Sequence, residues 1–97
     1  MTYDTAINEA PVVLVEFYAS WCPHCRKMMP VVEQIKELLD GQVPVIQLDI
    51  DNNKELSSRE QVESIPTFIV YRAGHEQWRH SGEIDGNDLL AKVQSYM

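Results

Sequence analysis

An apolar run leads directly into two closely spaced cysteines in the stretch VVLVEFYASWCPHC, residues 12–25. The run before the cysteines is almost entirely apolar and rich in β-branched side chains, a pattern typical of a strand covered on both faces. Pro23 follows Cys22 at once, and proline is tolerated in the first turn of a helix because its missing N–H has no helical partner there. The stretch therefore predicts a buried strand over residues 12–18 and a helix that starts near Cys22.

The rest of the chain alternates between helical and extended patterns. Apolar side chains recur at helical spacing from Met28 to Leu39, and Gly41 follows as a stop signal. We expect helices over residues 3–9, 22–39 and 53–60 and a last one capped by Asp85 or Asn87, with strands over residues 12–18, 43–50, 67–71 and 76–81.

This order of elements predicts an α/β fold. The first two strands are joined through a helix and should be parallel, whereas the last two form an antiparallel hairpin. Helices then cover both faces of a central four-stranded mixed sheet. The length allows one core, so we expect a single domain over residues 1–97.

Composition and charge exclude several classes of function. A formal net charge of −7 argues against a nucleic-acid surface, which needs clusters of Lys and Arg. Two cysteines so close together are not the framework of a disulfide-stapled secreted domain. The chain does not open on a secretory signal, and no apolar stretch approaches the ~20 residues of a membrane span. We expect a cytoplasmic protein without nucleic-acid or membrane partners, although an exported protein given a new start methionine would read the same.

The placement of the two cysteines suits thiol chemistry. Cys22 and Cys25 are separated by one helical turn, so their sulfurs lie near enough to bond. Unpaired N–H groups and a partial positive charge at a helix N-terminus favour a thiolate on the first cysteine. We therefore expect Cys22 to be the exposed nucleophile and Cys25 the more buried resolving thiol.

Half of a zinc site is the alternative interpretation of this cysteine pair. His75 and His80 have the spacing of a ligand pair and could complete a set of two cysteines and two histidines. A whole α/β unit separates the two pairs, however, and the histidines fall at opposite ends of a short polar strand, on opposite faces. We therefore expect no metal, and no organic cofactor either.

His24 lies between the cysteines and bears on their redox chemistry. A histidine there favours the Cys22 thiolate through its charge or through an N–H···S⁻ hydrogen bond. A very low thiol pKa does not serve attack, but it makes the thiol a better leaving group and its disulfide a stronger oxidant. We hypothesise that His24 makes the Cys22–Cys25 disulfide more oxidising than Gly-Pro between the cysteines would.

Over nearly its whole length the chain resembles the thioredoxin family. The motifs follow in the family's order with almost no gaps, which is far more specific than a C-x-x-C pair alone. They are the central strand and active-site entry at residues 12–22, the kink proline Pro30, the next strand at residues 45–51, the cis-proline motif Ile65-Pro66-Thr67, and the late glycines Gly74 and Gly82.

The resemblance implies a substrate groove around Cys22. Trp21, Ile65, Pro66 and Gly82 would line it, and the Ile65 backbone would pair with an extended segment of a protein substrate. The Ile65–Pro66 bond would be cis, with the proline ring beside the sulfurs.

Glu16 occupies the place of the family's buried aspartate. A carboxylate in an apolar strand has its pKa raised by desolvation, which suits it to accept the proton of Cys25 near neutral pH. The alternative is a glutamate that reaches solvent from the end of the strand, and its extra methylene leaves its reach to Cys25 open.

Four features depart from the family's pattern. Pro23-His24 replaces Gly-Pro and resembles the DsbA-type enzymes, whose helical insertion this chain has no length for. Gln47 stands where thioredoxin has a lysine near the buried acid, and Tyr18 replaces a tryptophan. The family's first strand is absent, which leaves residues 43–50 as a sheet edge, and we expect a monomer.

The resemblance implies reversible dithiol–disulfide exchange with protein substrates, in the form of a disulfide reductase recycled by a partner such as thioredoxin reductase. Two alternatives stay open. One is a more oxidising oxidase or isomerase set by His24, and the other is a binding module that uses the fold without turnover. The residues that would carry the chemistry are Cys22, Pro23, His24, Cys25 and Glu16.

Overall fold

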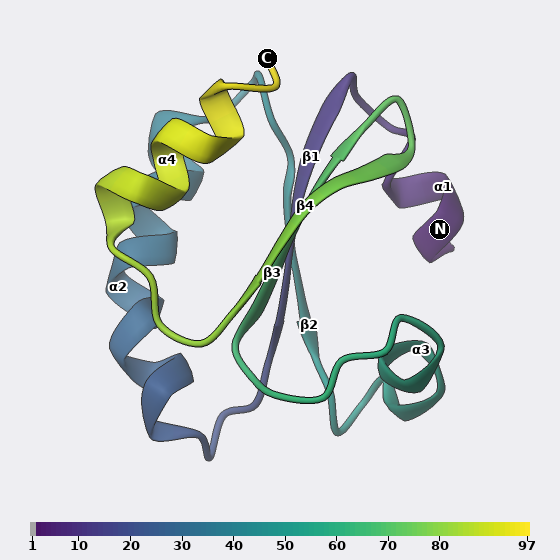
Figure 1. Cartoon of the computed structure of the whole chain (residues 1–97), viewed down its shortest axis with the longest axis vertical. Coiled ribbons are helices and arrows are strands. Elements are labelled where there is room, and N and C mark those ends of the chain that lie inside the picture. Colours follow the sequence, from purple (N-terminus) through teal and green to yellow (C-terminus); the bar gives the residue numbers. More distant parts are fainter. Residues whose placement is uncertain (1) are drawn as a thin grey trace.

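A computed structural model describes residues 2–97, whose strands form a mixed four-stranded sheet. The strands are β1 (Val12–Tyr18), β2 (Val45–Asp49), β3 (Thr67–Arg72) and β4 (His75–Ser81). They lie in the order β2-β1-β3-β4 (Figure 1). β1 and β2 are parallel, whereas β3 is antiparallel to both β1 and β4. The predicted α/β fold with a mixed sheet is confirmed.

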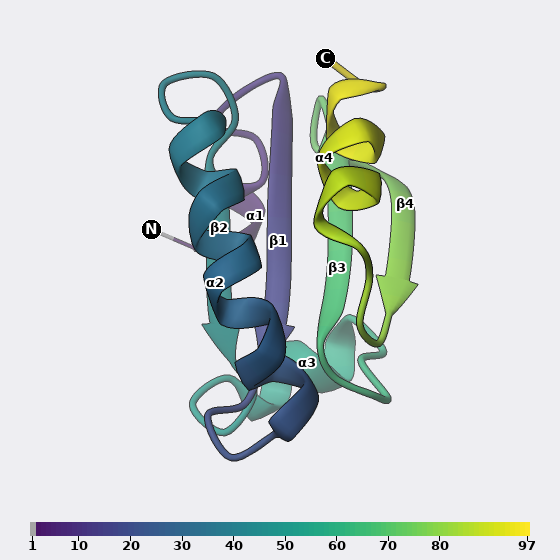
Figure 2. The ribbon, with the colours of Figure 1, turned by 90° about the vertical axis from the view of Figure 1, so that its left-hand side faces the viewer.

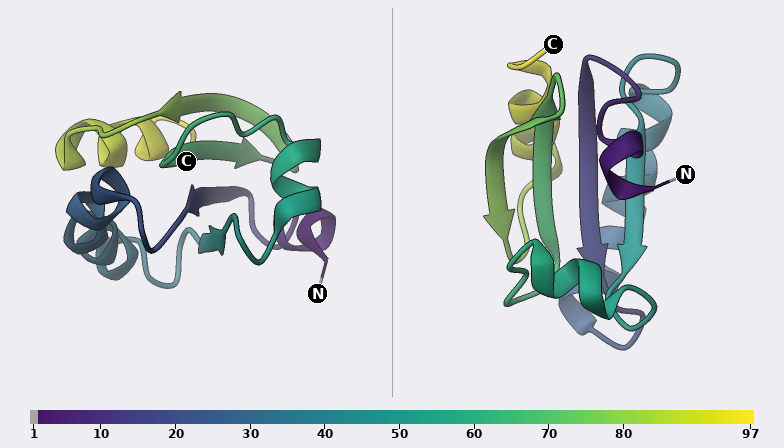
Figure 3. Two further views of the ribbon diagram at one scale, coloured as in Figure 1. Left: turned by 90° about the horizontal axis from the view of Figure 1, so that it is seen from below. Right: turned by 90° about the vertical axis from the view of Figure 1, so that its right-hand side faces the viewer.

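Helices cover both faces of this sheet. They are α1 (Tyr3–Ala6), α2 (Pro23–Leu38), α3 (Lys54–Arg59) and α4 (Gly86–Gln94). Figure 2 shows α2 and α4 over one face, and the right-hand view of Figure 3 shows α1 and α3 over the other. Between residues 2 and 97, no helix has the length and apolar character needed to cross a membrane.

Side chains of β1 point alternately into two hydrophobic cores, one on each face of the sheet. Val12 and Leu14 pack with apolar side chains of α2 and α4, whereas Val13, Val15 and Phe17 pack on the side of α1 and α3. Successive side chains of a strand point to opposite faces, so an inner strand with helices on both sides needs apolar residues at nearly every position. These five side chains are at most 3% exposed. The buried strand predicted over residues 12–18 is confirmed.

The helices end within a few residues of their predicted bounds. α1 stops at Ala6 instead of residue 9, and α2 fills residues 22–39 apart from its capping residues Cys22 and Leu39. α3 begins one residue later and ends one residue earlier than predicted. Asp85 is the N-cap of α4, where its carboxylate accepts hydrogen bonds from two backbone N–H groups of the first turn.

β2 is shorter than the extended segment predicted over residues 43–50. It begins at Val45, because Pro44 has no N–H to donate to the sheet. The carbonyl of Pro44 still accepts the N–H of Leu14 at 3.0 Å. β2 lies at the edge of the sheet, as the sequence predicts.

A hydrogen-bonded pair of tyrosines attaches α1 to the sheet. The hydroxyls of Tyr3 and Tyr71 are 2.6 Å apart, and the Tyr71 hydroxyl donates to Glu60 Oε1 at 3.1 Å. The Arg59 guanidinium lies 5.6 Å from the centre of the Tyr3 ring. Tyr71 is 4% exposed, and its burial raises the pKa of its hydroxyl to about 12. The Tyr71 hydroxyl therefore keeps its proton at neutral pH and can donate it to Glu60.

Replacing Tyr71 by Phe should lower the free energy of unfolding by about 1–3 kcal/mol, because the Tyr3 hydroxyl loses its partner in a part-buried place. Urea denaturation measures the change. Tyr96→Phe is the matched control, since its hydroxyl makes only a long hydrogen bond of 3.5 Å to the Gln77 carbonyl. The control should stay within about 0.5 kcal/mol of wild type. Equal losses in the two variants would contradict the role given to the tyrosine pair.

Candidate active site

The two cysteines lie where the inner strand β1 leads into α2. β1 ends at Tyr18, and after a short loop Cys22 forms the N-cap of α2 with an extended backbone, φ −85° and ψ 120°. Its carbonyl accepts the N–H of Arg26 at 3.0 Å, which is the first hydrogen bond of the helix. Cys25 is the third residue of α2 and stands on the same turn as Cys22. Both cysteines are free thiols.

The first turn of α2 lowers the pKa of the Cys22 thiol. The largest cause is a hydrogen bond from the backbone N–H of Cys25 to the Cys22 sulfur. Burial opposes this as the second-largest effect, and the Cys25 thiol, the backbone N–H of His24 and the charge of Arg26 lower the Cys22 pKa further. These N–H groups have no helical partner, so they favour a negative charge at the N-cap. Cys22 therefore has the properties of a nucleophile.

The pKa of the Cys25 thiol changes in the opposite direction. Burial raises the pKa of its thiol to about 12, and hydrogen bonding to Cys22 and the negative charges of Cys22 and Glu16 add to the effect. Cys25 therefore keeps its proton while Cys22 is a thiolate.

Both cysteines are more enclosed than the sequence suggests. Cys22 is 5% exposed and Cys25 is 1% exposed. The expectation of an exposed Cys22 is thus wrong, although Cys22 is the less buried of the two. The physical reason is local packing, since both cysteines form a buried cluster with Ala19, against which Ile65 packs.

Glu16 lies beneath α2 in the inner strand and is 3% exposed. The parallel register places Gln47 of β2 beside it, and Gln47 Nε2 donates a hydrogen bond of 3.1 Å to Glu16 Oε1. Burial raises the pKa of the Glu16 carboxyl, and the hydrogen bond from Gln47 lowers it by less. Its side chain does not reach solvent from the end of the strand, so the alternative considered for it is excluded.

A cavity of about 200 Å³ connects Glu16 with Cys25. This volume accommodates several water molecules, since each takes up about 30 Å³ in the liquid. The extra methylene of Glu16 therefore does not separate it from Cys25, because water can carry a proton between the two groups. The other walls of the cavity are Tyr18, Met29, Glu33 and Gln47.

The Ile65–Pro66 peptide bond lies next to Cys22 and is cis, as the resemblance implies. The Cys22 thiol donates to the Ile65 carbonyl at 3.9 Å. The N–H of Gly82 donates to the Pro66 carbonyl at 2.7 Å, and Gly82 adopts a φ of +98°, which favours glycine. The fold thus brings Ile65, Pro66 and Gly82 together beside Cys22.

Trp21 is the most exposed member of this group of residues. Its side chain is largely open to solvent, at 61% exposure. The indole Nε1 donates to Asp51 Oδ2 at 2.8 Å, which connects the loop before α2 to the loop before α3. An anchored, exposed aromatic ring beside a reactive sulfur suits contact with a protein chain.

The His24 ring is hydrogen-bonded to a residue outside the C-x-x-C motif. Its Nδ1 is hydrogen-bonded to Glu83 Oε2, in the loop between β4 and α4. The contribution of His24 to the Cys22 thiolate comes from its backbone N–H. The imidazole hydrogen bond to Cys22 considered from the sequence is therefore replaced by a bond to Glu83.

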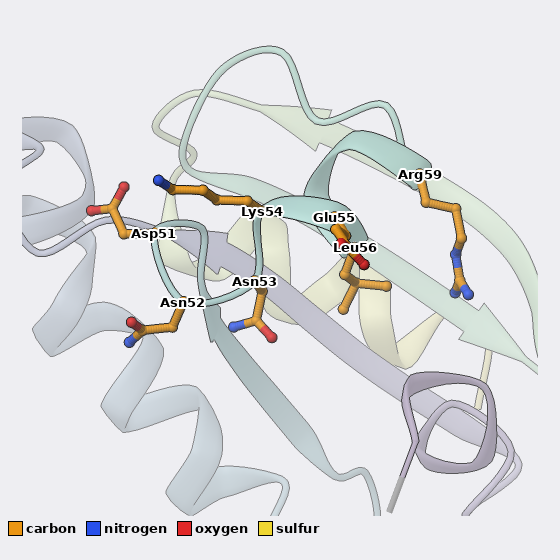
Figure 4. Close-up of a pocket in the computed structure, with 7 residues that line it drawn as sticks. All are labelled: Asp51, Asn52, Asn53, Lys54, Glu55, Leu56 and Arg59. Atoms are coloured by element: carbon orange, nitrogen blue, oxygen red, sulfur yellow. The ribbon is translucent and has the colours of Figure 1, made fainter.

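A second surface hollow, of about 550 Å³, lies over the start of α3 (Figure 4). Carboxylate, amide and basic side chains line it, together with Leu56, and none of the lining residues is a cysteine or histidine. Figure 4 shows Asp51, the partner of Trp21, at the opposite end of this hollow from Arg59. Within residues 2–97, no three His, Cys, Asp or Glu side chains form a group that could hold a metal ion. The thiol pair is thus the chemically distinctive feature of the described chain.

A family model described as Thioredoxin matches residues 1–95. The chain belongs to the thioredoxin family. A thioredoxin of Synechocystis sp. is 33% identical over 94 residues, which cover 97% of this chain and 87% of that protein. A mutant thioredoxin from Halobacterium salinarum has a solved structure with a TM-score of 0.87 and 32% identity, covering 96% of this chain and 80% of that one. The fold is therefore the thioredoxin fold.

Some relatives are much longer than this member of the thioredoxin family. Thioredoxin Y, chloroplastic, from Oryza sativa is 34% identical over 88 residues, which are 91% of this chain but 52% of that protein. Two chloroplastic thioredoxins of Arabidopsis thaliana are covered to a similar extent. The chain thus spans about half the length of these curated relatives.

Three residues at this site of the thioredoxin-family chain are not identified by the sequence reasoning. Glu83 binds His24, Asp51 binds Trp21, and Lys36 Nζ donates to Gln47 Oε1 at 3.3 Å. The last contact means that the amide of Gln47 joins Glu16 to a lysine, so the buried acid is connected to a positive charge indirectly. The position of Glu83 directly after Gly82 is the one signal in the sequence that pointed to this part of the site.

Glu16→Gln should stabilise the protein at neutral pH. The folded-state pKa of Glu16 is raised, so its contribution to stability is complete below the unfolded pKa of about 4.3 and is lost as pH rises through the folded pKa. The loss reaches at most about 1.4 kcal/mol per pH unit in that window. Urea denaturation across this pH range should show the variant gaining on wild type as pH rises. Glu33→Gln, at an exposed position on the same cavity, should show no such trend. A pH-independent difference for Glu16→Gln would contradict the assignment.

Proposed function

We propose that this chain is a thiol–disulfide oxidoreductase that works as a thioredoxin-like disulfide reductase on protein substrates. The observation that carries the proposal is the opposite treatment of two thiols on one helical turn. The first turn of α2 lowers the pKa of Cys22, and burial raises the pKa of Cys25. One thiol is ready to attack while the other is held protonated in reserve.

The first step is attack of the Cys22 thiolate on a substrate disulfide. A bond forms between Cys22 Sγ and one substrate sulfur, the substrate S–S bond breaks, and the other substrate sulfur leaves as a thiolate that takes up a proton. The product is a mixed disulfide. Its formation removes the negative charge of Cys22, which is one of the groups that raise the pKa of Cys25.

The second step is attack of Cys25 on the sulfur of Cys22. Cys25 loses its proton through the cavity to the carboxylate of Glu16, and its thiolate then forms the Cys22–Cys25 disulfide and releases the second substrate thiol. Two electrons have then passed from the protein to the substrate, whose two sulfurs leave as thiolates and take up protons from water, while the proton of Cys25 is held by Glu16. A reductant has to restore the dithiol, and we propose a reductase of the thioredoxin reductase class for this step.

Substrate would dock as an extended segment over Cys22. The Ile65 main chain lies beside the Cys22 sulfur, and Trp21 offers an exposed ring at the edge of the same area. The N–H of Gly82 is hydrogen-bonded to the carbonyl of Pro66, which follows Ile65 in the chain, so this surface is preorganised. We infer that it recognises the main chain of a protein substrate beside its disulfide.

The second candidate is a more oxidising enzyme, an oxidase or an isomerase, and the presence of His24 between the cysteines favours it. The hydrogen bond of the imidazole to Glu83 supports the reductase instead, because the ring is occupied away from Cys22. The equilibrium with glutathione separates the two. A potential near or below about −250 mV supports the reductase, and one nearer about −150 mV supports the oxidant.

Reduction of insulin disulfides, with dithiothreitol as the reductant, tests turnover. Wild type should accelerate the reaction, and Cys22→Ser should fall to the uncatalysed rate because the attacking sulfur is gone. Cys25→Ser should react once and remain joined to its substrate, which mass spectrometry detects as a mixed disulfide. Tyr96→Phe, remote from the cysteines, should keep the wild-type rate. Absence of turnover by the wild-type chain would overturn the proposal in favour of a binding module.

A further inference from the structure

One side-chain hydrogen bond joins the active-site turn to the loop that follows β4. His24 Nδ1 bonds to Glu83 Oε2, and the two side chains are 64% and 39% exposed. The two residues are far apart in sequence, but each lies next to a segment that surrounds Cys22. His24 belongs to the same turn as both cysteines, and Glu83 follows Gly82 of the proposed substrate groove.

The position of Glu83 is fixed by its neighbours. The Glu83 carbonyl is hydrogen-bonded to His80 Nε2 at 3.1 Å, and the His80 ring stacks on Trp78 with 5.9 Å between ring centres. On the other side, the N–H of Gly82 donates to the Pro66 carbonyl at 2.7 Å. The loop therefore presents the Glu83 carboxylate to the first turn of α2 in a defined place.

We propose that Glu83 is a positioning residue that sets the redox potential of the Cys22–Cys25 couple by holding the His24 imidazole away from the Cys22 sulfur. The inference rests on the proposed function, because it assumes that this couple exchanges electrons. It adds a residue outside the C-x-x-C motif that keeps the couple reducing even though a histidine stands between the cysteines.

The electrostatics of the turn give the direction of the effect. The pKa of Glu83 is lowered, first by its hydrogen bond to His24 and then by the charge of Lys27, whose Nζ lies 4.0 Å away. Glu83 is therefore a carboxylate at neutral pH. The charged and titratable groups that face the pair are Lys27, His80 and, toward Cys22, Arg26. Removing the carboxylate leaves the positive charges of this turn less balanced and frees the imidazole to approach the Cys22 thiolate.

A better stabilised thiolate favours the dithiol over the disulfide, so the couple becomes more oxidising. The size of the change follows from the exposure of the pair. Solvent screens interactions between exposed groups, so we expect a change of up to about fivefold in the equilibrium constant. A change of this size in the ratio of dithiol to disulfide can be measured, so it shows whether Glu83 affects the redox potential.

The experiment equilibrates the full chain with glutathione buffers at neutral pH and measures the ratio of dithiol to disulfide after acid quench and thiol labelling. Glu83→Gln keeps the size of the side chain and removes its charge. It should raise the ratio about two- to fivefold at the same glutathione composition. Glu63→Gln is the matched control, since it removes one exposed carboxylate two residues before Ile65 without touching His24, and it should leave the ratio unchanged.

The same substitution in a His24→Ala background shows whether Glu83 acts through His24. There the effect of Glu83→Gln should fall to less than half of its value in the wild-type background. An unchanged ratio for Glu83→Gln, a lowered one, or an equal increase in the His24→Ala background would each overturn the inference. Insulin turnover is measured separately. If the chain equilibrates with glutathione but reduces no protein disulfide, the proposed function fails, and the dithiol-to-disulfide ratios still test the role of Glu83.

Discussion

The first turn of α2 is held against the end of the inner strand β1, and every part of the site depends on this junction. Seven residues of β1 span the sheet, and its apolar side chains are buried beneath helices on both faces. Met28, Val32 and Ile35 anchor α2 on one of those faces. The N-terminus of α2 is thereby fixed with its unpaired N–H groups around the Cys22 sulfur. Without this packing, the pKa values of the two thiols would no longer be shifted in opposite directions.

The two thiols at this junction differ in pKa because they lie at different depths. Cys22 lies at the N-cap of α2, whose first turn lowers the pKa of its thiol, whereas Cys25 lines the cavity that it shares with Glu16. A buried carboxyl in the strand has a cost in stability at neutral pH, as its raised pKa indicates. This cost is understandable as part of the chemistry, since the same burial that disfavours the Glu16 carboxylate brings its pKa closer to the pH at which a proton has to move.

Features with a local cause could be predicted from the sequence. The strand over residues 12–18 and the helix that follows it come from periodicity and from Pro23, and the fate of Glu16 follows from its place in an apolar strand. The cis bond before Pro66 could be expected only from the resemblance to a family, since an Ile-Pro pair has no local feature that requires it.

Contacts between distant segments could not be predicted. The bond between His24 and Glu83 spans 59 positions of sequence, and that between Trp21 and Asp51 spans 30. Neither has a periodic pattern, because both depend on how loops meet after the sheet has formed. The enclosure of Cys22 also arises in this way, from the packing of Ile65. Tertiary contacts of this kind decide what His24 does, although its position between the cysteines is evident from the sequence.

The most direct test of the account is the pH dependence of the rate at which iodoacetamide alkylates Cys22 in the reduced chain, with peptide mass mapping to identify the modified cysteine. Only the thiolate reacts, so the midpoint of the profile reports the Cys22 pKa. The account predicts a midpoint clearly below the value of about 8.5 for an ordinary cysteine, with the label on Cys22 and not on Cys25. A midpoint at or above about 8.5, or label shared equally by the two cysteines, would contradict it.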